Sequence, residues 1–152
     1  MNRRLLNLIG GTLTLSVGLW AADPLLGTWK LNLEKSKFGS RPMPKSNQIT
    51  WTEKGGTFRY AAKGVGPNGQ PTQTEIPSFK FDGKEYPLST GGTVALKRAD
   101  PLHFQSTGMK NGKKTFSNKS VISKDGKTIT SVWQMADESG KLQSWTSVLD
   151  KQ

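Results

Sequence analysis

The sequence offers few side chains that could carry out covalent or acid–base chemistry. It contains no cysteine, so thiolate metal sites, cysteine nucleophiles and disulfides are excluded. His103 is the only histidine, and its neighbours Leu102 and Phe104 place it on the opposite, solvent-facing side of a strand. Four carboxylates fall in expected turns, and no spacing pairs two of them for glycosidase-type catalysis: Asp82, Asp125, Asp137 and Glu138. We therefore expect a non-enzymatic protein without catalytic residues, metal site or cofactor.

Aromatic residues are the side chains that could instead hold a ligand, because they recur at alternating positions of short apolar segments. Small barrels fill their interior with side chains, so the same pattern also fits plain core packing. A hydroxyl in phase with Ile129 and Trp133 could orient a ligand, although a partly wet core would contain one as well. The candidate ligand-binding residues are Trp51, Phe58, Tyr60, Phe79, Phe104, Phe116, Ser131, Trp133 and Trp145.

The elements that must position these residues are short strands joined by turns. Asp82-Gly83, Asn111-Gly112 and Asp125-Gly126 are typical of tight hairpins, and Pro77 predicts a break or bulge. No window after the first residues repeats apolar side chains at helical spacing. The expected strands are residues 25–33, 48–53, 57–62, 72–81, 85–88, 93–98, 102–107, 115–122, 128–135 and 143–149. This pattern predicts an all-β fold, an antiparallel up-and-down meander closed into a barrel of about eight to ten strands, with a β-sandwich as the alternative.

Two segments are expected to shape the ends of the barrel. Residues 35–45 contain Pro42 and Pro44 and lack alternation, which predicts an extended loop across one end. Trp29 follows Gly27 in the first strand, and we expect Trp29 to plug the opposite, closed end. A ligand is therefore expected at the end that the loop covers.

The first 22 residues are typical of a secretory signal peptide. Arg3 and Arg4 precede an apolar run, and cleavage is expected after Ala21 or Ala22, with an uncleaved form as a minor alternative. Residues 23–152 would then form a single monomeric domain in the periplasm or outside the cell, without a transmembrane anchor. Export also argues against nucleic acid as a partner.

The chain is strongly basic, with a formal net charge of +11. The lysines are spread over expected turns, which favours solubility and protection of strand edges. The functional alternative is attraction to an acidic partner or an anionic envelope surface.

Gly27-Thr28-Trp29 resembles the Gly-x-Trp signature of the lipocalins, which belong to the wider group of calycins. In lipocalins an arginine near the last strand covers this tryptophan, whereas the last strand here offers Lys151. The layout of the longer matching segments is similar to that of a group of secreted bacterial lipocalin-like proteins: residues 27–32, 35–38, 42–46, 80–87 and 123–128. The resemblance implies a lipocalin-like barrel and an apolar ligand, and it assigns no activity.

These observations together favour a secreted or periplasmic protein that binds a small apolar or amphipathic ligand in its barrel. The alternative is a non-enzymatic envelope protein that uses its basic turns to contact an acidic partner or surface.

Overall fold

The computed structural model describes residues 21–137 and 139–152. Most of the expected signal peptide, residues 1–20, and Glu138, which was expected in a turn, lie outside the described residues. The described part consists of antiparallel strands and turns, and no helix in it is long and apolar enough to cross a membrane. Its ten strands are β1 (Gly27–Leu31), β2 (Ser46–Lys54), β3 (Thr57–Val65), β4 (Pro71–Phe79), β5 (Asp82–Pro87), β6 (Thr93–Asp100), β7 (His103–Lys110), β8 (Lys113–Ile122), β9 (Thr128–Ala136) and β10 (Leu142–Lys151).

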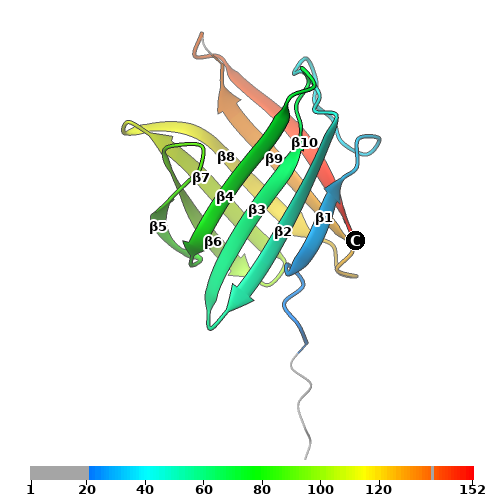
Figure 1. Cartoon of the computed structure of the whole chain (residues 1–152), viewed down its shortest axis with the longest axis vertical. Coiled ribbons are helices and arrows are strands. Elements are labelled where there is room, and N and C mark those ends of the chain that lie inside the picture. The colour runs from blue at the N-terminus through cyan, green and yellow to red at the C-terminus, as the bar shows by residue number, and fades with distance from the viewer. Residues whose placement is uncertain (1–20, 138) are drawn as a thin grey trace, which may run out of the picture.

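The strands wind around a common interior as a meander, so the predicted all-β up-and-down barrel is confirmed (Figure 1). Neighbours run in the order β4-β3-β2-β1-β10-β9-β8-β7-β6-β5 within a single sheet. The first and last strands pair directly, with Trp29 opposite Lys151 and Leu31 opposite Leu149. This pairing curls one sheet into a nearly closed barrel instead of the two sheets of a sandwich.

The barrel has one seam, between β4 and β5, where no ladder of backbone hydrogen bonds forms within the described chain. Asp82-Gly83 predicted a tight hairpin here, and this prediction is wrong because both residues already belong to β5. Phe81 packs on Phe79 at a ring-centroid distance of 5.3 Å, which draws the turn inward and separates the two strands. Ser89 bridges the seam with two hydrogen bonds: its N–H donates to the Glu75 carbonyl at 3.0 Å, and its hydroxyl accepts from the Glu75 N–H at 2.8 Å.

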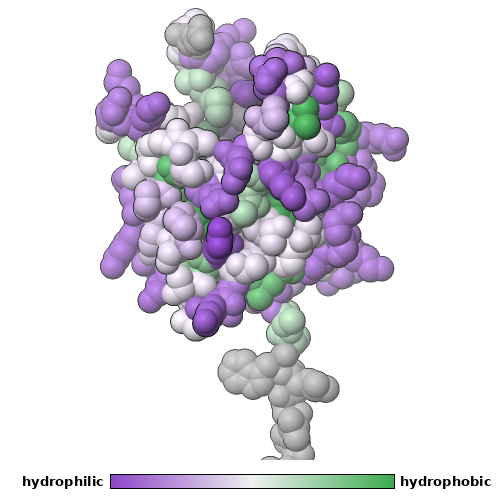
Figure 2. All heavy atoms as spheres, in the orientation of Figure 1, coloured by the Kyte–Doolittle hydropathy of each residue, from purple (hydrophilic) through white to green (hydrophobic). Residues whose placement is uncertain are grey.

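Period-two alternation sets which side chains face the interior. In β6, Val94 and Leu96 are buried while Lys97 is exposed, as expected for a strand with one wet face. At Pro77 the ladder between β3 and β4 shifts register, as predicted for a proline within a strand. Hydrophilic side chains spread over much of the outer face (Figure 2). The apolar core consequently lies inside the barrel.

The closed end of the barrel is packed around Trp29, as the sequence predicts. Trp29 is fully buried, and its Nε1 donates a hydrogen bond of 2.8 Å to the Leu25 carbonyl. The Lys151 ammonium lies 4.9 Å from the centroid of the Trp29 ring. A side chain on Gly27, whose φ is +119°, would meet Lys151 at 3.3 Å, so glycine leaves room for this lysine. Lys151, which the sequence analysis compared with the arginine of lipocalins, therefore covers the ring.

An ion pair ties the start of the described chain to the closed end. Asp23 accepts two hydrogen bonds from the Arg98 guanidinium, at 2.5 and 2.8 Å. Burial alone would raise the pKa of Asp23, but hydrogen bonds from Arg98 and the Leu25 N–H, together with the charges of Arg98 and Lys151, lower it below its ordinary value of 3.8.

We expect Asp23→Asn to lower the free energy of unfolding by about 1.5 to 3 kcal/mol at neutral pH, the range for hydrogen bonds to charged groups. Because the folded-state pKa of Asp23 is depressed, its contribution is present above the ordinary pKa and is lost as the pH falls through the folded-state value. Urea unfolding from about pH 7 to about pH 2 should therefore show wild type and variant converging in acid. The exposed Glu34→Gln serves as the control, and a constant gap across this range would contradict the assignment.

Candidate functional site

The barrel contains a cavity of about 520 Å³ that opens to solvent at the end opposite Trp29. The segment between β1 and β2 covers this end and contributes Phe38, Arg41, Pro42 and Pro44 to the cavity lining. The sequence predicted a loop in this place, and the structure positions it over the opening. Figure 1 shows the segment at the same end as the turns that join β3 to β4 and β9 to β10.

Backbone hydrogen bonds at both ends of this covering segment fix its path. Lys37 and Thr146 exchange two bonds, at 2.8 and 2.9 Å, so the segment continues the pairing of β1 with β10. At the far side the Lys45 N–H donates to the Val65 carbonyl at 2.9 Å. The residues between these anchors must therefore cross the mouth of the cavity.

Seven of the nine candidate ligand-binding residues line the cavity: Trp51, Tyr60, Phe104, Phe116, Ser131, Trp133 and Trp145. Trp51 and Phe104 also belong to the aromatic cluster of the closed end, with ring centroids 5.7 Å apart, and so form the floor of the cavity. Burial raises the pKa of Tyr60 well above its ordinary value, so its phenol stays neutral. The role of these seven residues in binding remains a prediction.

Phe58 and Phe79 do not line the cavity, contrary to their place in the candidate set. Their rings lie 5.8 Å apart and pack with Phe81 at the closed end. The register shift at Pro77 places Phe79 opposite Phe58. Phe58 is the second residue of β3, next to the turn that joins β2 to β3. Alternation correctly indicated that both side chains point inward. It did not indicate how far along the barrel axis they lie.

A stack of flat groups runs from the covering segment down one wall. The Arg41 guanidinium carbon lies 3.9 Å from the centroid of the Trp145 ring, and Trp145 lies nearly parallel to Trp133 at 5.7 Å. Phe116 packs against Trp133 at 5.8 Å with its ring tilted by 47°. Phe116 lies flat over Gly108, where a Cβ would come within 2.2 Å of the ring. The sequence analysis did not select Arg41, because nothing in an irregular loop indicates which way a side chain points.

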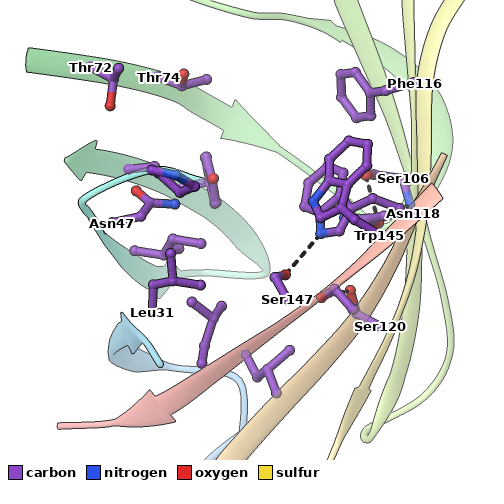
Figure 3. Close-up of a pocket in the computed structure, with 18 of the residues that line it drawn as sticks. Leu31, Asn47, Thr72, Thr74, Ser106, Phe116, Asn118, Ser120, Trp145 and Ser147 are labelled. Carbon is purple, nitrogen blue, oxygen red and sulfur yellow. Dashed lines mark hydrogen bonds between the residues drawn. The ribbon is translucent and has the colours of Figure 1, made fainter. Parts of the chain in front are cut away.

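Below this stack, uncharged polar side chains form a band across four neighbouring strands (Figure 3). We define the polar band as Ser106 of β7, Asn118 and Ser120 of β8, Ser131 of β9 and Ser147 of β10. Only Ser131 was in the candidate set. The signal was nevertheless present, since each of these residues alternates in phase with the inward apolar residues of its strand.

Hydrogen bonds join all five members of the polar band to one another or to the wall. The Ser106 hydroxyl donates to Asn118 Oδ1 at 2.9 Å, and the Ser120 and Ser131 hydroxyls lie 2.7 Å apart. Trp133 Nε1 donates to the Ser147 hydroxyl at 3.0 Å. The band is thus a preformed polar surface inside a mainly apolar cavity.

His103, the only histidine, lies away from the cavity. It is exposed at the closed-end start of β7, where its Nδ1 is 2.8 Å from Asp100 Oδ1. Hydrogen bonds from His103 and from the Leu102 N–H hold the pKa of Asp100 below its ordinary value. The described residues contain no group of three or more histidine, cysteine or acidic side chains that could hold a metal ion.

Comparison with protein-family models gives no match, and neither does comparison with curated proteins. Among solved structures, the barrel resembles a fatty acid binding protein of Schistosoma mansoni in complex with arachidonic acid, with a TM-score of 0.59, 14% identity, and coverage of 85% of this chain and 96% of that one. It also resembles a zebrafish ileal bile acid-binding protein complexed with cholic acid, with a TM-score of 0.53, 14% identity, and coverage of 85% and 99%. These likenesses show the fold, so the predicted antiparallel up-and-down barrel is confirmed.

Proposed function

We propose that this chain is a non-enzymatic, monomeric protein that binds a small apolar or amphipathic ligand inside its barrel, in the periplasm or outside the cell. The observation that carries the proposal is the covered cavity of about 520 Å³, whose lining is mainly aromatic and aliphatic with a few convergent polar groups. Ligand sites are typically concave, mostly apolar and of this size. A barrel filled by its own side chains, the alternative raised by the sequence, would leave no such space.

The fold supports the proposal without identifying the ligand. The two similar structures hold arachidonic acid and cholic acid, both of which are amphipathic acids with an apolar body. At 14% identity the comparison supports the same barrel fold but not the same ligand. The lining residues of this chain must therefore supply the argument for what enters the cavity.

Binding should be visible in the intrinsic fluorescence of the protein, because Trp51, Trp133 and Trp145 line the cavity. We expect a panel of long-chain acids, alcohols and sterols to include compounds that quench or shift this emission at a saturable site. Protein purified from its own host should show a co-purifying small molecule by native mass spectrometry. Trp133→Phe and Trp145→Phe should reduce the optical response. The absence of both a bound molecule and a response to the whole panel would contradict the proposal.

The alternative function, contact between basic turns and an acidic surface, does not depend on the cavity and stays a prediction. Lys110, Lys113 and Lys114 flank the turn between β7 and β8, at the same end as the mouth. Such a surface would therefore face the opening through which a ligand passes.

A further inference from the structure

One donor in the polar band has no partner in the described chain. Asn118 is 8% exposed, and its Oδ1 accepts from both the N–H and the hydroxyl of Ser106, at 3.1 and 2.9 Å. These two donors fix the orientation of the amide, because only its oxygen can accept them. The Nδ2 group consequently points away from Ser106, and it donates to no described residue.

The free Nδ2 of Asn118 faces the cavity. Among the described residues, only Trp51 Nε1 is a fully enclosed side-chain nitrogen or oxygen without a partner, so Asn118 Nδ2 must border open space. Asn118 is otherwise buried, and the space it borders is the cavity that it lines. Figure 3 shows Asn118 beside Ser106 on the wall opposite Leu31 and Thr72. An unmet donor in such a place favours a ligand that brings a hydrogen-bond acceptor.

Charge inside the cavity is confined to its mouth. Of the residues that line it, Arg41 alone carries a charged side chain at neutral pH. Arg41 stacks on Trp145 at 3.9 Å, donates to the Met135 sulfur at 3.7 Å, and forms no ion pair with a described carboxylate. The polar band, by contrast, offers hydroxyls and an amide but no cation. An ionised group buried there would lose its hydration without compensation, whereas at the mouth it meets a guanidinium.

We propose that the cavity takes an amphiphile with two recognition points: an anionic end group held at the mouth by Arg41, and an uncharged oxygen within its apolar body that accepts a hydrogen bond from Asn118. A ketone, ester, ether or hydroxyl oxygen would serve. This inference rests on the proposed function, because it specifies the ligand of the same cavity.

A series of matched 16-carbon compounds tests the two points on the unmodified protein. The series consists of hexadecanoic acid, hexadecanol, and hexadecanoic acids that carry one keto group at successive chain positions. We expect one short window of keto positions to bind about 5- to 10-fold more tightly than hexadecanoic acid, as one net hydrogen bond allows. Hexadecanol should bind more weakly than hexadecanoic acid.

Two variants assign these preferences to the named residues. Asn118→Asp keeps an oxygen for Ser106 but removes the free donor, so the preferred keto acid should lose its advantage over hexadecanoic acid. Arg41→Gln should remove the advantage of the acid over hexadecanol, and Arg41→Lys should retain part of it because the charge remains. Equal affinity across the keto positions of the wild type, or equal affinity for acid and alcohol, would overturn the inference while leaving the proposed function intact. Failure of every compound in this series to bind would overturn the inference, and the proposed function would fall with it only if the fluorescence panel and native mass spectrometry also detected no ligand.

Discussion

Replacing Trp29 with alanine is expected to lower the free energy of unfolding by about 3 to 5 kcal/mol, the range for removing a buried aromatic side chain. Trp29 is fully buried, and its indole N–H is bonded to the Leu25 carbonyl. The substitution would leave a void between the closed end and Lys151, and it would also leave that carbonyl without its partner. Chemical unfolding followed by far-ultraviolet circular dichroism measures the loss without relying on the deleted chromophore.

Trp29→Phe provides the matched control, because it retains an aromatic ring but removes the hydrogen bond to Leu25. Its loss of stability should be smaller than that of Trp29→Ala. Neither variant should change ligand affinity at temperatures where it is folded, since Trp29 does not line the cavity. A stable Trp29→Ala protein that has lost only its binding would show that Trp29 belongs to the ligand site.

Placing an aromatic ring inside the cavity should abolish most ligand binding. Ala62 of β3 lines the cavity and is 8% exposed, so Ala62→Phe directs a ring into the space that a ligand would occupy. A void of about 150 Å³ holds one benzene ring. The new side chain would therefore take more than a quarter of the 520 Å³ available. We expect the affinity for the best ligand of the fluorescence panel to fall at least about 10-fold, or about 1.4 kcal/mol.

The neighbouring residue supplies the control for this substitution. Ala61 alternates to the other face of β3 and does not line the cavity, so Ala61→Phe adds the same ring to the same strand outside the barrel. The affinity of Ala61→Phe for the ligand should equal that of the wild type. Equal losses in Ala61→Phe and Ala62→Phe, or an unchanged affinity in Ala62→Phe, would place the ligand elsewhere.

Much of the fold was predictable because its signals are local. Asn111-Gly112 forms the turn between β7 and β8 with φ of 51° and 71°, as this pair of residues favours. Alternation located all ten strands, although the first is shorter than residues 25–33. The seam could not be predicted from Asp82-Gly83, because separation of β4 from β5 depends on the burial of Phe81 among rings from distant strands.

The candidate site was predicted in part, for a related physical reason. Alternation tells whether a residue points inward, and this correctly brought Trp133 and Trp145 to the cavity wall. It does not tell how far along the barrel a residue lies, which explains why Phe58 and Phe79 were misplaced. The contact of Arg41 with Trp145 joins a loop to a strand more than a hundred positions later. No local sequence pattern predicts a contact between residues so far apart.

The ladder between β1 and β10 also has a consequence for how the molecule acquires its shape. The strands that close the barrel are the first and the last, so Trp29 finds its partner Lys151 only when nearly the whole chain is present. Pairing between residues so distant in sequence is slow, because the intervening chain must lose conformational entropy before the contact contributes any stabilisation. A polypeptide emerging from a ribosome therefore cannot close the barrel until β10 has been made. Folding of this barrel therefore requires β10 as well as β1.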